Sequence, residues 1–265
     1  EIWTGIVSLF HNLIRNTLKE GVVVRAFSNG DLGVTLFDPR EYAEDAHKTV
    51  DDRPFGGGPG MVMMAGPLSA SVSAARRICP SENPVTVYLS PQGTRFTQSL
   101  AIKLAALPAL VLVAGRYEGV DERFIEREAD LELSIGDYVL SGGELAAMVV
   151  LDTVARLLPG VVGNPESIKS ESHMDGLLDF PHYTRPREFG GDRVPDVLLQ
   201  GDHGAIEEWR QKQALGRTWL KRPDMLLRRE LSSEERKLLM EALDTITETS
   251  PPPEGDKGDW IDESE

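Results

Sequence analysis

The chain has 265 residues, a hydrophobic content of 40%, a charged content of 27% and one cysteine, Cys79. This balance is typical of a globular protein with a buried core, and a single cysteine excludes an internal disulfide framework and favours a reducing compartment. No apolar run approaches the roughly 18 residues of a membrane span, and residues 1–10 lack the features of a secretion signal. We therefore expect a cytoplasmic protein with no membrane partner.

The net charge of −15 is unevenly distributed along the chain. Residues 241–265 carry nine acids against one lysine, whereas residues 209–237 carry nine basic residues against four acids. The sum therefore hides a locally basic stretch, and phosphate contacts need such residues. Charge alone does not predict binding to RNA, and we expect no DNA partner.

Apolar patterns predict alternating strands and helices up to about residue 160. We expect strands at 2–10, 85–89, 109–114 and 131–135, helices at 11–21, 67–78, 97–106 and 144–158, and short β-prone runs within 22–37. Short apolar strands that alternate with helices are typical of a parallel sheet covered on both faces. The fold class predicted is α/β.

The remainder of the chain has a different character. Residues 161–175 are polar and lack periodicity, and residues 247–265 combine a proline run with many acids, which is typical of disorder. Helices are expected at 203–215, at 217–229 and after the capping pattern Ser232-x-x-Glu235. We predict an α/β domain over 1–160, a flexible linker over 161–175, a small all-helical domain over 176–246 and a disordered acidic tail over 247–265.

Several common catalytic motifs are missing. The glycine cluster at 56–60 fits neither a phosphate loop nor the dinucleotide-binding spacing. The sequence has no Gly-x-Ser-x-Gly elbow, and its five histidines show no close metal-ligand spacing. These observations argue against P-loop enzymes, zinc enzymes and serine or cysteine hydrolases, and we predict no metal site.

Three glycine-bearing loops each follow a predicted strand, at 89–93, 115–119 and 135–143. Ligands of open α/β sheets bind outside the carboxyl ends of the strands, and glycine lets the backbone approach a ligand closely. The loops therefore suit a compact nucleoside cofactor. Their spacing is equally compatible with glycines that only turn the chain after each strand, which leaves open an unrelated nucleotide-binding or hydrolytic α/β protein.

Longer motifs resemble those of the bacterial tRNA (guanine-N1)-methyltransferases, the TrmD family of the knotted SPOUT superfamily. They are TVDDRPFGGGPGM at 49–61, GRYEG at 115–119, SIGDYVLSGGE at 134–144, PHYTRP at 181–186 and WRQKQALGRTWLKRP at 209–223. The resemblance covers about residues 3–226. It implies methyl transfer from S-adenosylmethionine to N1 of the guanine at position 37 of tRNA, next to the anticodon.

The same resemblance implies a SPOUT-type parallel sheet with a C-terminal trefoil knot, and a homodimer. It also implies a set of residues that hold S-adenosylmethionine: Leu89, Pro91, Gly115, Tyr117, Glu118, Ile135, Gly136, Asp137, Tyr138, Val139, Leu140, Gly142 and Gly143. Glu118 is further implied as a residue that helps to place Mg²⁺, although nothing in the sequence demands a metal.

Guanine N1 carries a proton, and its loss places negative charge on O6, so the reaction needs a base and a cation. The resemblance assigns the cation to Arg156, which without it would be read as a surface ion pair with Asp152. It assigns the base to Glu171, where relatives have aspartate, and Asp175 is an alternative. A relative that binds RNA without catalysis is the second functional hypothesis.

The resemblance also implies that the second domain binds the anticodon stem-loop of tRNA. Candidate contacts are basic residues interleaved with two tryptophans: Arg185, Trp209, Arg210, Arg217, Trp219, Lys221 and Arg222. Burial in the core of a small helical domain is the more frequent role of such tryptophans.

Overall fold

A computed structural model describes residues 1–163 and 171–249 of the chain. The chain forms two compact units, Glu1–Ile168 and Lys169–Glu265. Residues 164–170 of the expected linker and 250–265 of the expected tail lie outside the described residues. The domain boundaries at 160 and 176 stay predictions.

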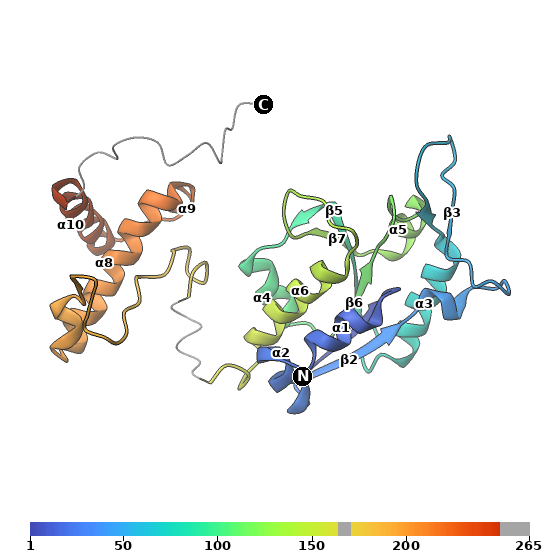
Figure 1. The fold of residues 1–265 in the computed structure, drawn as a ribbon, viewed down its shortest axis with the longest axis horizontal. Coiled ribbons are helices and arrows are strands. Elements are labelled where there is room, and N and C mark those ends of the chain that lie inside the picture. The colour runs from blue at the N-terminus through green and yellow to red at the C-terminus, as the bar shows by residue number, and fades with distance from the viewer. Residues whose placement is uncertain (164–170, 250–265) are drawn as a thin grey trace. The chain divides into compact units, whose positions relative to one another are not determined.

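The first unit alternates strands with helices (Figure 1). Its elements in chain order are β1 (Ile2–Val7), α1 (His11–Thr17), α2 (Gly21–Ser28), β2 (Leu32–Phe37), η1 (Pro39–Tyr42), β3 (Asp51–Asp52), β4 (Val62–Met63), α3 (Ala65–Ile78), β5 (Val85–Arg95), α4 (Gln98–Ala105), β6 (Ala109–Ala114), α5 (Glu122–Glu128), β7 (Leu131–Ser134) and α6 (Glu144–Leu157).

Within the described residues, five strands form one parallel sheet in the order β2-β1-β6-β5-β7. Successive side chains on β6 point to opposite faces, so Leu110 and Leu112 join one buried cluster whereas Val111 and Val113 join the other. The first cluster is completed by α1, α2, α4 and α6, and the second by α3 and α5. The predicted α/β class and parallel sheet are confirmed, and the trefoil knot stays a prediction.

Two helices of the first unit differ from the sequence-based expectation. Residues 21–28 form α2 rather than a strand, because Val23 and Ala26 are buried on a face that packs against α6. Tertiary packing here overrides the β propensity of three consecutive valines. Helix α5 is absent from the expected elements, and its Asp121 caps the first turn by accepting from the Arg123 amide.

Strand β5 is longer than expected because it bulges and then resumes pairing. Leu89 and Thr94 both pair with Leu133 of β7, so the residues between them leave the ladder. Gly93 permits the return: a Cβ there would lie 2.3 Å from the Leu133 nitrogen. The bulge therefore projects Ser90 and Gln92 out of the sheet at its carboxyl end.

The second unit packs three helices around a small leucine core that includes Leu215, Leu226 and Leu238. Its elements are β8 (Glu188–Phe189), β9 (Asp192–Arg193), η2 (Asp196–Leu199), α8 (His203–Lys221), α9 (Pro223–Leu227) and α10 (Ser233–Thr249). The unit thus contains a short β-hairpin in addition to the expected helices.

The helices of this unit begin and end differently from the expectation. A single helix, α8, replaces the break expected near residue 216, because Gly216 is buried within it. Pro223 then starts α9 at the first helical position, where proline is well tolerated. The predicted capping pattern of α10 is confirmed: the Glu235 amide donates to Ser232 Oγ at 3.1 Å, and the Ser232 amide donates to Glu235 Oε2 at 2.8 Å.

No helix in the described part of the chain combines the length and the apolar character that crossing a membrane requires.

The close approach of β5 and β7 generates the first prediction. Gly93→Ala should lower the free energy of unfolding by about 1–3 kcal/mol, the usual cost of overpacking, because the new methyl group would meet backbone atoms. Gly66→Ala in α3 is the control: no atom lies within 4 Å of its added Cβ, and we expect a gain of about 0.4–1 kcal/mol. Urea unfolding measures both changes, and equal stability of the two variants would contradict the prediction.

Candidate functional site

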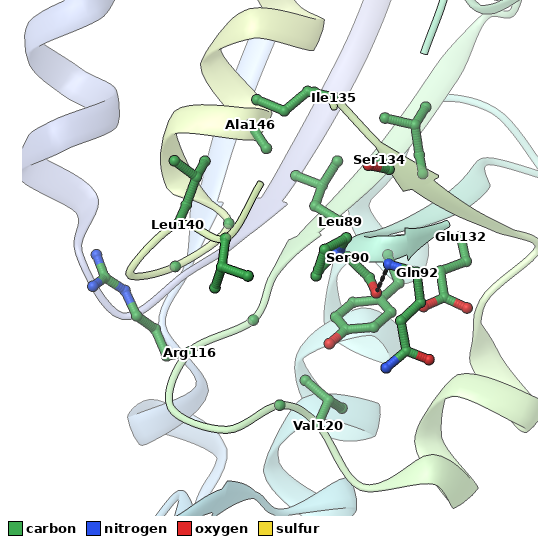
Figure 2. A pocket seen from close by; sticks show the side chains of 18 of the residues that line it. Leu89, Ser90, Gln92, Arg116, Val120, Glu132, Ser134, Ile135, Leu140 and Ala146 are labelled. Atoms are coloured by element: carbon green, nitrogen blue, oxygen red, sulfur yellow. Dashed lines mark hydrogen bonds between the residues drawn. The ribbon is translucent and has the colours of Figure 1, made fainter. Parts of the chain in front are cut away.

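A cavity of about 240 Å³ opens at the carboxyl ends of β5, β6 and β7 (Figure 2). Each wall is a segment that follows or interrupts one of these strands: the β5 bulge, residues 115–120 after β6, and residues 135–143 after β7. Parallel strands bring these segments to the same edge of the sheet, which is where open α/β proteins bind ligands.

The cavity gathers most of the residues that the sequence assigned to the cofactor. Twelve of the thirteen line it: Leu89, Pro91, Gly115, Tyr117, Glu118, Ile135, Gly136, Tyr138, Val139, Leu140, Gly142 and Gly143. Asp137 does not line it. The structure thus brings these residues together, and their contact with a cofactor stays a prediction.

The loop after β6 is held by a segment from far earlier in the chain. The Glu118 amide donates to the Met61 carbonyl at 3.0 Å, and the Met63 amide donates to the Gly119 carbonyl at 2.9 Å. Gly60 makes this approach possible, because a Cβ there would lie 2.3 Å from Glu118 Cγ. The glycine-rich segment at 55–60 therefore ends against the wall of the cavity.

The loop after β7 contacts the loop after β6 through two glycines. The Gly143 amide donates to the Gly115 carbonyl at 2.8 Å, and Gly142 forms a bridge with Arg116. A Cβ on Gly143 would lie 2.8 Å from Ala114 Cα. Neither glycine position has space for a side chain where these two walls of the cavity meet.

The lining carries more acidic than basic side chains. Glu118, Glu122 and Glu132 line the cavity together with Arg116. Figure 2 shows the Arg116 guanidinium pointing away from Leu89, at the rim of the cavity. A lining of this sign favours a cationic ligand over an anionic one.

Tyr88 forms part of the buried floor of the cavity. Burial, with smaller effects of Glu132 and Glu122, raises the pKa of its phenol to about 12. Burial likewise raises the pKa of Tyr117, with Asp51 adding to the effect. Both phenols therefore stay protonated at neutral pH and serve as hydrogen-bonding groups.

The sequence reasoning missed several lining residues. Ser90 and Gln92 belong to a loop that the sequence singled out, and the Gln92 amide donates to Ser90 Oγ at 3.1 Å (Figure 2). Glu132 lies on β7, in a run read only as strand. Glu132 could have been found from the sequence, because a charged residue within a short apolar strand indicates that its side chain does not face the hydrophobic core.

The two candidate catalytic residues belong to different units. Arg156 is half-buried in the last turn of α6, and Asp152 is exposed one turn earlier. Glu171 is half-buried in the second unit, in a turn where the Met174 amide donates to the Glu171 carbonyl at 3.2 Å.

Two neighbouring carboxylates have structural partners. Asp175 Oδ2 lies 3.4 Å from Arg229 Nη1, and Asp175 Oδ1 accepts from the Leu177 amide. Asp179 accepts from the Phe180 amide at 2.8 Å and lies 2.9 Å from His182 Nε2. These contacts fix the loop in which Glu171 lies.

Some of the candidate RNA-binding residues contact other side chains of the second unit. The Arg210 guanidinium lies 4.9 Å from the centre of the Phe180 ring, and Arg222 pairs with Asp224 at 2.8 Å. Trp209 is half-buried against Tyr183, and Trp219 is exposed. The expectation of two core tryptophans is wrong for Trp219, because the small core is filled by leucines.

Among the described residues, no group of three His, Cys, Asp or Glu side chains is arranged to hold a metal ion. A role of Glu118 in placing Mg²⁺ stays a prediction.

The parallel sheet and the cavity at its carboxyl edge place the chain among open α/β proteins, which bind ligands at this edge. Within this class the chain belongs to one family: the family model described as tRNA (Guanine-1)-methyltransferase TrmD matches residues 2–228. The resemblance seen in the sequence motifs is thereby confirmed.

Curated relatives agree with this family. A protein of Pseudomonas paraeruginosa named tRNA (guanine-N(1)-)-methyltransferase is 54% identical over 240 residues, which cover 91% of this chain and 95% of that protein. Proteins of the same name from Nitrosospira multiformis and Methylococcus capsulatus are 54% identical over 242 and 237 residues. Each alignment covers 89% of this chain and 94% of the relative.

The raised pKa of Tyr88 generates the second prediction. At about pH 10.5 a phenol with a pKa near 12 stays mostly protonated, whereas an ordinary phenol is mostly ionised. The absorbance difference between the unaltered protein and Tyr88→Phe should therefore show almost no phenolate at that pH. Because the unfolded chain loses this proton first, the contribution of Tyr88 to stability should fall as the pH rises from 10 to about 12. A full phenolate signal at pH 10.5 in the folded protein would refute the assignment.

Proposed function

We propose that this chain transfers a methyl group from S-adenosylmethionine to N1 of guanine 37 in tRNA. Membership of the methyltransferase family carries the reaction class and the nucleic acid. The single structural observation that supports the cofactor is the cavity, around which twelve family-implied residues from three separate segments converge.

The residues of the cavity fit S-adenosylmethionine in shape and charge. Gly115 and Gly143 let the loops that line the cavity pack closely, since a Cβ there would meet protein atoms at 3.1 Å and 2.8 Å, and glycine lets main-chain groups approach a ligand. The acidic lining suits a ligand whose sulfonium, ammonium and carboxylate groups sum to one positive charge. The cofactor supplies the methyl group that is transferred, so the protein needs no covalent nucleophile.

The remaining chemistry falls to side chains that handle the guanine. In this proposal Glu171 accepts the proton from N1, and the guanidinium of Arg156 stabilises the negative charge that develops on O6. Asp175 is the alternative base; its carboxylate pairs with Arg229 and accepts from the Leu177 amide.

The homodimer also belongs to this proposal. Helices α1 and α6 contact each other, and four large apolar side chains on or next to them are 43–55% exposed: Phe10, the N-cap of α1, Leu13, Leu145 and Val149. Contiguous exposed apolar surface marks protein interfaces. On α6 the spacing of 145, 149, 152 and 156 continues one helical face, so a partner docked there would lie beside Arg156.

A relative that binds RNA without catalysis is not favoured, because the family model spans both units and the cavity is formed. Labelled methyl transfer to tRNA transcripts decides between the two. We expect label on a transcript with guanine at position 37 and none on a transcript with that base replaced. Equal labelling of both transcripts would refute the target, and no labelling of either would favour the inactive relative.

The identity of the base generates a separate prediction. Glu171→Gln should lower kcat by about 100-fold or more, the usual contribution of a positioned base, and leave the affinity for S-adenosylmethionine unchanged. Asp175→Asn is the matched control, with the same loss of charge four residues away, and should retain most of kcat. Single-turnover methyl transfer measures both variants. The reverse order of effects would identify Asp175 as the base.

A further inference from the structure

Glu144, the first residue of α6, is a buried charge that the proposed chemistry does not use. Its side chain is 1% exposed. Its Oε1 accepts from the Ser8 hydroxyl at 2.9 Å, and its Oε2 lies 2.9 Å from Arg116 Nε. That N–H is not aimed at the oxygen, so the contact with Arg116 is an ion pair rather than a hydrogen bond.

Burying two charges is costly, and replacing such a pair by apolar residues is often neutral or stabilising. A gain in the stability of the folded protein is therefore a weak explanation for this ion pair.

The two partners of Glu144 extend to other segments. Arg116 Nη1 donates to the Ser141 carbonyl at 3.0 Å, and the guanidinium carbon lies 4.2 Å from the centre of the Phe10 ring. Ser8 Oγ accepts from the Phe10 amide at 2.9 Å. One carboxylate thus joins the chain after β1, the loop after β6 and the loop before α6.

Two of the joined segments are walls of the cavity. Gly142 lies against Arg116 so closely that a Cβ would be 2.2 Å from Arg116 Nε, and Gly142 and Gly143 both line the cavity. Glu144 and Ser8 do not line it. The carboxylate therefore acts on the cavity through Arg116, which lines it, and through the backbone of the two loops.

We propose that Glu144 is a positioning residue: its pair with Arg116 holds the loop after β6 against the loop before α6 and so fixes the shape of the cofactor cavity. The inference rests on the proposed function for its ligand, S-adenosylmethionine. The pair also neutralises Arg116, which would otherwise place a positive charge at the rim of a cavity suited to a cation. Both effects lower the affinity for the cofactor when the carboxylate is lost.

The test compares Glu144→Gln with Glu128→Gln, which breaks a different ion pair. Glu128 Oε2 lies 2.6 Å from Arg76, near the amino ends of the strands, and does not line the cavity. Titration calorimetry with S-adenosylmethionine should show Kd raised about tenfold or more in Glu144→Gln and within about twofold of the unaltered protein in Glu128→Gln. Both substitutions should lower Tm, so Tm alone does not distinguish positioning from stability.

Amide hydrogen exchange gives a readout that needs no ligand. We expect faster exchange at residues 115–120 and 137–143 in Glu144→Gln, with no change there in Glu128→Gln, because only the first substitution releases the contact between these loops. Unchanged Kd and unchanged exchange in folded Glu144→Gln would overturn the proposal. Failure of the unaltered protein to bind S-adenosylmethionine would instead overturn the proposed function, and the exchange comparison would still test the contact.

If Glu144→Gln does not fold, two milder substitutions test the positioning role of Glu144. Ser8→Ala removes one hydrogen bond to Glu144, and Arg116→Lys keeps the charge but loses the planar fork that spans Glu144 and Ser141. We expect Arg116→Lys to raise Kd more than Ser8→Ala, with faster exchange at 137–143. Unchanged Kd and exchange in Arg116→Lys would overturn the proposal.

Discussion

Backbone contact between distant segments is the constraint on which the cavity depends. Gly93 brings β5 back against β7, Gly143 brings the start of α6 against the end of β6, and Gly60 brings the glycine-rich loop against Glu118. At each place a Cβ would come within 3 Å of another atom, a distance that protein packing does not tolerate. At Gly93 and Gly143 the atoms met are main-chain atoms, and at Gly60 they belong to the Glu118 side chain. The ion pair between Arg116 and Glu144 adds a side-chain contact between two of the walls.

The sheet determines where these contacts occur. Apolar clusters pack on both of its faces, and few polar side chains, such as Thr4 and Thr86, are buried on its strands. Polar and charged groups therefore gather at the strand ends, where Glu118, Glu122 and Glu132 line one edge. At the opposite edge Arg76 of α3 binds Glu128 of α5 and Thr86 of β5, and so joins both helices to the sheet.

Local patterns were enough to predict the regular core and the cavity loops. The short continuous apolar run of β6 indicates a strand buried on both faces. Gly115 directly follows this strand, and Gly143 directly precedes α6. Helix α2 was not predictable, since its valines favour a strand until α6 is present to cover Val23. The pairing of Glu144 with Ser8 joins residues 136 apart in the sequence, and no periodicity reports such a contact. The roles of Glu171 and Arg156 came from family motifs alone, because an isolated charge in a linker or on a helix has no distinguishing pattern.

The cavity is lined by glycines in close contact with other segments and by exposed side chains, and these two kinds of residue differ in which substitutions they tolerate. Gly143 cannot gain a side chain without moving the backbone of the neighbouring loop, and a side chain on Gly142 would displace Arg116, whereas Tyr138 and Val139 are 55% and 85% exposed. Under the proposed function, a competitive inhibitor that contacts only the exposed side chains would depend on atoms that a substitution can change without a backbone shift. One that fills the space beside Gly143 would contact a wall that cannot gain a side chain without such a shift.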